Sequence, residues 1–194
     1  YFPKIQAVLR KYDILLVADE VICGFGRTGN MFGSTTYGVE PDMISCAKQL
    51  SAAYMPISAL MVNGRIADAL VDQSRRIGTF SHGFTYGGHP VAAAVALEAL
   101  TIYEERDIVG HVRRVAPAFL QGMKRFEDHP LIGEARGVGL VGALEFVRDK
   151  TTKENFAPSA GVAAHAGRMA TKHGVITRGL GDIISLCPAM IITE

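Results

Sequence analysis

Two ionisable side chains follow short apolar runs near the start of the sequence. Asp19 comes directly after the apolar residues 15–18, and Lys48 follows the mostly apolar residues 43–47. In open α/β sheets, ligands bind in the crevice beyond the carboxyl ends of the strands. If both runs are strands, they deliver one carboxylate and one amine to a shared crevice. We therefore expect Asp19 and Lys48 to face the same ligand.

An amine and a carboxylate facing one ligand suit the chemistry of pyridoxal phosphate (PLP). A lysine amine forms a Schiff base with an aldehyde, and removal from water favours the neutral amine that attacks it. PLP withdraws electrons best when its pyridine nitrogen keeps a proton, and a nearby carboxylate favours that form by ~1–4 kcal/mol. Lys48 and Asp19 are the candidates for these two roles. Taken alone, such a pair is more often an ordinary ion pair or a helix cap.

The elements that would position these residues indicate an α/β fold. Residues 14–18 and 43–46 are apolar runs without polar alternation, which is typical of strands buried on both faces of a parallel sheet. Pro90 suits the first turn of a helix, and the alanine-rich residues after it predict a long helix to about Arg106. A second, amphipathic helix is predicted over residues 111–127. We expect the alanine-rich helix to pack closely against a sheet.

His129 and Pro130 interrupt the second helix and mark the predicted domain boundary. Residues 1–128 are then part of a large domain with its connecting helices, and residues 129–194 are part of a smaller α+β domain. The smaller domain is predicted to contain a strand at 139–146, a helix at 162–173 and strands at 175–178 and 183–187. We expect both domains to be incomplete, because Tyr1 is not an initiator methionine, a helix-like segment leads at once into the first apolar run, and the sequence stops where a strand finishes and a further element would be expected.

The composition argues against several classes of function. The 194 residues include 20 Lys and Arg against 19 Asp and Glu, which disfavours a nucleic-acid partner. The three cysteines form no C-x-x-C pair, which fits a reducing cytosol, and the six histidines form no H-E-x-x-H metal motif. No apolar run reaches the roughly 18 residues that a membrane span requires. We expect a cytoplasmic protein with no bound metal and no membrane or nucleic-acid partner.

Six short motifs follow one another along the sequence. They are DEV (residues 19–21), GFGRTG (24–29), PD (41–42), AKQL (47–50), FTYGGHP (84–90) and RGLGD (178–182). Their order and spacing resemble the class III (omega) aminotransferase family, PLP-dependent enzymes of fold type I, over essentially the whole chain. The resemblance implies a mostly parallel sheet with flanking helices in the large PLP-binding domain. It also implies a smaller α+β C-terminal domain.

The resemblance assigns roles to five residues. Lys48 would form the Schiff base with the cofactor and move a proton between the alpha carbon of the substrate and C4′ of the cofactor. Asp19 would hold the pyridine nitrogen, and Val21 would pack against one face of the ring. Thr85 would bind the cofactor phosphate of the neighbouring subunit, which implies a homodimer or higher homo-oligomer; its plainer interpretation is a helix N-cap. Arg178 would bind a substrate carboxylate, or else form a surface salt bridge.

The function implied is that of an aminotransferase. It would move an amino group from an amine or omega-amino acid to a 2-oxo acid such as pyruvate, through pyridoxamine phosphate. A PLP-dependent aminomutase or decarboxylase of the same fold and a non-catalytic remnant remain alternatives. A Schiff-base aldolase would need a closed (β/α)₈ barrel, which the two-domain pattern disfavours. The family's phosphate loop, ring-stacking aromatic and another acid are expected upstream of Tyr1, so we expect this chain alone to be inactive.

Three glycine-containing strings resemble motifs of other enzymes. Residues 24–29 and 137–142 both read G-x-G-x-x-G, but neither opens a helix directly after a strand, so we predict turns at both. Residues 78–83, GTFSHG, miss the G-x-S-x-G pattern of serine hydrolases by one position.

Overall fold

A computed structural model describes residues 1–194, which fold as two compact units. Unit 1 consists of Tyr1–Gly26 and Asn30–Asp107, and unit 2 consists of Arg27–Gly29 and Ile108–Glu194. The units therefore divide at Asp107, earlier than the predicted boundary at residues 128 and 129. The reason is that helix α5 (Ile108–Lys124) contributes Met123 to the core of unit 2 and so belongs with the strands that follow it.

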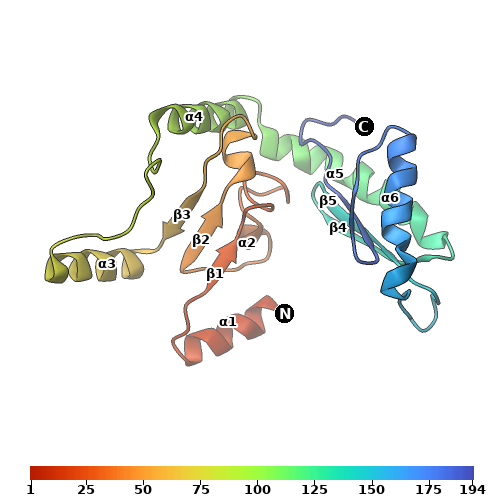
Figure 1. Cartoon of the computed structure of the whole chain (residues 1–194), viewed down its shortest axis with the longest axis horizontal. Helices are drawn as coiled ribbons and strands as arrows, with labels where there is room; N and C mark the ends of the chain where they lie inside the picture. The colour runs from red at the N-terminus through yellow and green to blue at the C-terminus, as the bar shows by residue number, and fades with distance from the viewer. The chain divides into compact units, whose positions relative to one another are not determined.

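Unit 1 combines a small sheet with helices (Figure 1). Its elements are α1 (Phe2–Lys11), β1 (Val17–Asp19), α2 (Gly33–Thr36), β2 (Met43–Cys46), the 3₁₀ helix η1 (Lys48–Ser51), β3 (Ala59–Val62), α3 (Gly64–Ile77) and α4 (Pro90–Glu105). The strand order is β1-β2-β3. Strands β1 and β2 are parallel, whereas β2 and β3 are antiparallel. The predicted α/β class is confirmed, and the sheet within this chain is mixed.

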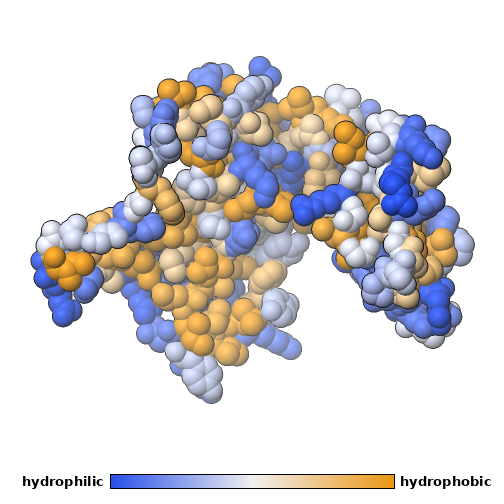
Figure 2. All heavy atoms as spheres, viewed as in Figure 1, coloured by the Kyte–Doolittle hydropathy of each residue, from blue (hydrophilic) through white to orange (hydrophobic).

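The faces of this sheet are largely exposed. Val17 of β1 is 51% exposed and Leu60 of β3 is 61% exposed. Figure 2 shows hydrophobic residues gathered over this part of unit 1. The prediction of strands buried on both faces is therefore wrong for the first run, of which only residues 17–18 are strand and Val17 is exposed. Residues 43–46 do form a strand, which is half-buried and ends at the buried Cys46. Helix α3 adds no cover, because it contains no buried residue. Large exposed apolar areas are typical of surfaces that pack against further polypeptide.

Helix α4 confirms the predicted alanine-rich helix. Pro90 occupies its first turn, where the missing N–H group has no intrahelical partner to lose. The helix buries Ala92, Ala96, Ala99 and Tyr103. Small side chains on one stripe allow a close approach, but the main neighbour of α4 is η1 and not a strand, so the predicted packing against a sheet is not found within this chain. No helix of the chain combines the length and apolar character needed to cross a membrane.

Unit 2 has the predicted α+β composition. Its elements are α5, the 3₁₀ helix η2 (Arg125–Asp128), β4 (Ile132–Val138), β5 (Val141–Phe146), the 3₁₀ helix η3 (Pro158–Ala160), α6 (Val162–Lys172), β6 (Arg178–Leu180) and β7 (Ile183–Leu186). The strand order is β4-β5-β7-β6, and every pairing is antiparallel. Strand β4 was not predicted, and β6 begins where the predicted strand 175–178 ends.

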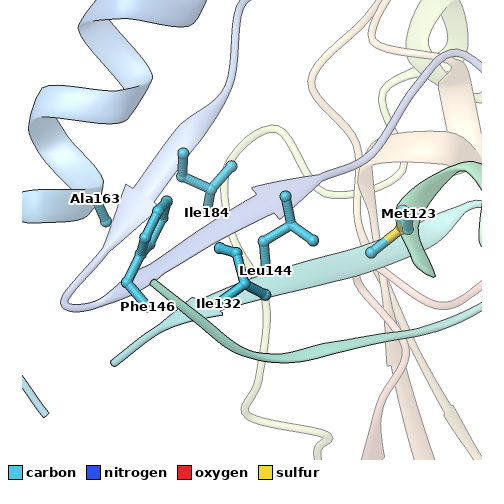
Figure 3. Close-up of a cluster of buried hydrophobic side chains, with 6 residues drawn as sticks. All are labelled: Met123, Ile132, Leu144, Phe146, Ala163 and Ile184. Atoms are coloured by element: carbon cyan, nitrogen blue, oxygen red, sulfur yellow. The ribbon is translucent and has the colours of Figure 1, made fainter. Parts of the chain in front are cut away.

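The core of unit 2 lies between its sheet and its two long helices (Figure 3). Its buried residues are Met123 of α5, Ile132 of β4, Leu144 and Phe146 of β5, Ala163 of α6 and Ile184 of β7. Leu144 and Phe146 are two positions apart, so both point to the same face of β5. Gly142, two positions earlier, leaves the space that Met123 fills, because a Cβ atom there would lie 2.3 Å from the sulfur of Met123 and would displace this side chain. Helix α5 can therefore approach β5 closely.

The GFGRTG string crosses from one unit to the other. Its residues Arg27–Gly29 belong to unit 2, where the buried guanidinium of Arg27 donates hydrogen bonds to the carbonyl oxygens of Leu140 and Pro188. The main-chain N–H of Leu140 donates to the carbonyl of Arg27 at 3.0 Å. Gly139, with φ of 56°, must be glycine here, since a Cβ atom would lie 2.4 Å from that carbonyl oxygen. Residues 24–29 are turns, as predicted, whereas residues 137–142 form the end of β4, a tight turn at Gly139 and Leu140, and the start of β5, so the prediction of a turn holds there only for the middle of the string.

Candidate functional site

Asp19 and Lys48 lie at the carboxyl ends of two adjacent parallel strands. Asp19 is the last residue of β1, and its partner on β2 is Ser45. Lys48 comes two residues after Cys46, the last residue of β2. Neighbouring strands lie about 4.8 Å apart, so the two residues share one edge of the sheet. Both side chains are exposed in this chain. The sequence pattern correctly predicted that these two strand ends are neighbours.

The backbone at Lys48 is in the left-handed region. Its φ is 47°, which for a residue other than glycine costs about 1–3 kcal/mol and persists only where the surroundings hold it. Tyr103 of α4 helps to hold this conformation. Its hydroxyl lies 2.8 Å from the main-chain carbonyl oxygen of Gln49 and 3.0 Å from the side-chain oxygen of Gln49, so it can donate a hydrogen bond to either. The carbonyl of Lys48 also accepts from the N–H of Ala53 at 3.3 Å. The left-handed turn that carries Lys48 is thus anchored to α4.

Asp19 is fixed by the turn that follows it. One of its carboxylate oxygens accepts a hydrogen bond from the main-chain N–H of Val21 at 3.0 Å. Asp19 also lines a pocket of about 460 Å³, together with residues that include Cys23, Gly33 and Tyr37. Val21 itself is half-buried. The carboxylate is therefore both held in one direction and open to a ligand.

Glu20 is a buried acid beside the site that sequence reasoning did not identify. It is 3% exposed, although its neighbour Asp19 is exposed. Burial raises the pKa of the nearby Cys46 thiol; a hydrogen bond with Ala59 opposes part of this increase, and the Glu20 carboxylate adds a smaller increase. Cys46 therefore stays a protonated thiol near neutral pH and is not a nucleophile of this site.

Asp42 holds the opposite ends of the same strands. One carboxylate oxygen accepts from the N–H of Leu16 at 2.8 Å, and the other accepts from the amide of Asn63 at 2.8 Å. The hydrogen bond from Leu16 lowers the pKa of the Asp42 carboxyl below its ordinary value and outweighs the opposing effect of desolvation, with Asn63 and Arg65 adding smaller decreases. Asp42 thus ties together the segments that lead into β1 and out of β3.

Thr85 lies in an exposed segment of unit 1, apart from the pocket beside Asp19. Residues 75–91 are all exposed, and the segment turns at residues 85–88. A second pocket, of about 830 Å³, lies here and is lined by Met55, Phe84 and Tyr86 among others. The N-cap of α4 is His89, so the interpretation of Thr85 as the cap of that helix is wrong. Thr85 is thus free of a capping role within this chain.

Arg178 belongs to unit 2. It is the first residue of β6, pairs with Ser185 of β7 and is exposed, like the rest of its strand. Its backbone is held by the sheet, and its guanidinium is accessible to an anion.

The donor set at the carboxyl edge of β1 and β2 fits PLP. An amine suits the cofactor aldehyde and a carboxylate suits its pyridine nitrogen, and adjacent parallel strands supply one of each. The hydrogen-bonded turns at Asp19 and Lys48 fix the backbone positions from which the carboxylate and the amine extend. No other pairing of a lysine and an acid at neighbouring strand ends was suggested by the sequence.

Comparisons with known proteins agree with this chemistry. A family model described as aminotransferase class-III matches residues 1–194. The chain is 52% identical over 193 residues to "Gamma aminobutyrate transaminase 1, mitochondrial" of Solanum lycopersicum, covering 100% of this chain and 38% of that protein. It is 51% identical over 194 residues to "Probable gamma-aminobutyrate transaminase 2, mitochondrial" of Oryza sativa subsp. japonica, covering 39% of it. The chain thus spans well under half the length of these curated relatives.

Solved structures give the same result. An omega transaminase from Pseudomonas jessenii in complex with PMP matches with a TM-score of 0.96 and 48% identity, covering 100% of this chain and 43% of that one. A structure titled "Transaminase with L-ala" matches with a TM-score of 0.95 and 50% identity, covering 100% of this chain and 46% of that one.

Proposed function

The chain belongs to the class III aminotransferase family, and on that premise we propose that the complete protein is a PLP-dependent aminotransferase. The proposed reaction moves an amino group from an amine or omega-amino acid to a 2-oxo acid such as pyruvate. The observation that carries the proposal is the placement of Asp19 and Lys48 at the ends of two adjacent parallel strands. Relatives named for gamma-aminobutyrate, an omega-amino acid, support the choice of donor.

Lys48 is proposed to hold the cofactor and to move the proton. Bound PLP would supply an electron-withdrawing ring that carries the amino group between the two substrates. The amine of Lys48 would hold that group through its aldehyde and would accept and return the proton at the substrate alpha carbon. The anchored turn at residues 48–51 fixes the backbone from which the Lys48 side chain extends.

Asp19 is proposed to hold the proton of the cofactor ring nitrogen. Its carboxylate is directed by the N–H of Val21 before any ligand binds, so little ordering is needed on binding. Val21 follows Asp19 in the same turn, and we propose that its side chain packs against the ring. Arg178 is proposed to bind a substrate carboxylate, a task that suits the planar guanidinium.

We propose that the site is shared between two copies of the chain in a homodimer or higher homo-oligomer. Thr85 would bind the cofactor phosphate of the neighbouring subunit. The exposure of the segment around Thr85, with Phe84 81% and Tyr86 80% exposed, supports a surface that another chain covers. The exposed sheet of unit 1 supports the further proposal that the present residues alone are inactive. Two relatives are named as mitochondrial, and a cytoplasmic location stays a prediction for this protein.

The two half-reactions test the proposed function directly. When the complete protein loaded with PLP is mixed with gamma-aminobutyrate and no 2-oxo acid, we expect the visible absorbance of the cofactor to fall and pyridoxamine phosphate to be recovered by chromatography. Addition of pyruvate should restore the absorbance and yield alanine. Release of carbon dioxide without pyridoxamine phosphate would indicate a decarboxylase, and an isomerised amino acid would indicate an aminomutase. Either of these results would contradict the proposal.

A further inference from the structure

Glu20 is a buried carboxylate directly behind a proposed cofactor residue. It follows Asp19, the last residue of β1, and successive residues at a strand end point to opposite sides. Asp19 is exposed, whereas Glu20 is 3% exposed. A buried carboxylate is costly unless hydrogen bonds satisfy it. Its presence at this position therefore requires a structural reason.

The carboxylate, the main-chain N–H and the main-chain carbonyl of Glu20 all form hydrogen bonds that stabilise the turn after β1. One carboxylate oxygen accepts from the N–H of Gly33 at 2.8 Å and the other from the N–H of Ser34 at 2.6 Å. Its own N–H donates to the carbonyl of Ser45 at 2.9 Å, and its carbonyl accepts from Gly24 at 2.9 Å. Glu20 thus links the end of β1 to β2 and to the start of α2.

The space around the Glu20 carboxylate is also closed. A Cβ atom on Gly33 would lie 2.9 Å from Cβ of Cys23 and 3.2 Å from a carboxylate oxygen of Glu20. The carboxylate therefore has little freedom to move without breaking its two hydrogen bonds. The Asp19 carboxylate is held by the N–H of Val21, the residue on the other side of Glu20. A shift of Glu20 would turn the peptide that directs Asp19.

We propose that Glu20 is a positioning residue, whose buried carboxylate fixes the turn at residues 19–21 so that Asp19 is oriented toward the cofactor ring before the cofactor binds. The inference rests on the proposed function and adds a residue that acts only through Asp19. It does not require Glu20 to touch the cofactor.

A double-mutant cycle on the complete protein separates this role from a general structural one. In the Glu20→Gln variant an NH₂ group replaces one acceptor and faces a main-chain N–H, so we expect the dissociation constant for PLP to rise about tenfold. In the Asp19→Asn background the same change should alter that constant by less than about twofold, because the group that Glu20 positions is already disabled. The measurement is fluorescence titration of the apoprotein with PLP, with the thermal midpoint of each apoprotein recorded alongside.

Matched variants make each outcome decisive. Glu40→Gln changes an acid of unit 1 whose side chain is 81% exposed, and it should leave PLP binding unchanged. Gly33→Ala keeps Glu20 but crowds its carboxylate, so it should raise the dissociation constant in the same direction if Glu20→Gln does not fold. The inference would be overturned if Glu20→Gln left the dissociation constant for PLP unchanged, or raised it equally in the wild-type and Asp19→Asn backgrounds. In either case, PLP binding by the wild-type protein would leave the proposed function standing. A wild-type protein that does not bind PLP would sink both.

Discussion

The Lys48→Ala variant of the complete protein is expected to lose at least about a thousandfold in kcat, with its fold retained. The variant removes both the covalent hold on the cofactor and the group that moves the proton, and proton transfer by a positioned side chain alone contributes about 10²–10⁴-fold. Lys48 is exposed in a turn anchored by Tyr103 through Gln49, so the substitution empties no core. Steady-state kinetics with gamma-aminobutyrate and pyruvate measure the loss.

A lysine elsewhere provides the control for this variant. Lys172 is an exposed residue at the end of α6, and Lys172→Ala should keep wild-type kinetics. A small primary amine added to Lys48→Ala should restore part of the rate, because it can replace the missing proton carrier. Wild-type turnover by Lys48→Ala would show that another residue carries the chemistry.

The Asp19→Asn variant is expected to lose about tenfold to a thousandfold in kcat and to bind PLP more weakly. A carboxylate close to a protonated ring nitrogen stabilises it by ~1–4 kcal/mol, and an amide of the same size supplies no charge. The Michaelis constant for the amino donor should change little, since Asp19 is proposed to act on the ring and not on the substrate. Kinetics and PLP titration of the same preparation measure both effects.

An exposed acid of α3 is the matched control for Asp19. Asp68→Asn makes the same chemical change on a helix with no buried residue, and we expect wild-type kinetics and cofactor affinity from it. If Asp19→Asn behaves in the same way, Asp19 is not the partner of the ring nitrogen.

Part of the fold could be predicted because some local signals are strong. Met43–Cys46 is a short apolar run and is a strand, and the alanine-rich residues after Pro90 form α4. These signals also placed Asp19 and Lys48 at strand ends. Helix α3 was not predicted, although its sequence carries a signal at each end. The side-chain oxygen of the N-cap Asn63 accepts a hydrogen bond from the N–H of Ile66 at 3.1 Å, and Gly78 ends the helix with φ of 80°.

The rest of the site depends on contacts between residues distant in sequence. Glu20 accepts hydrogen bonds from Gly33 and Ser34, and Tyr103 reaches Gln49 across 54 positions. No local pattern reports such pairs; the only sequence signal for Glu20 is a second acid directly after Asp19, followed by the apolar Val21 and Ile22. The two-sided burial expected of β1 failed for a related reason, because burial depends on what covers a strand and not on its own sequence.

The division into units was also set by packing at a distance. A proline after residue 128 interrupts the helical pattern, but α5 packs on the sheet of unit 2 before that point through Met123. Residues Arg27–Gly29 belong to unit 2 because the side chain of Arg27 donates hydrogen bonds to Leu140 and Pro188, which lie more than 100 positions away in the sequence.

Borohydride reduction followed by peptide mapping tests the central claim most directly. Reduction of the PLP-loaded complete protein should attach a stable phosphopyridoxyl group, and mass spectrometry of the digest should find it on Lys48. The label should be absent from that peptide in Lys48→Ala. A label on any other lysine of the wild-type protein would contradict the assignment of this strand end as the cofactor site.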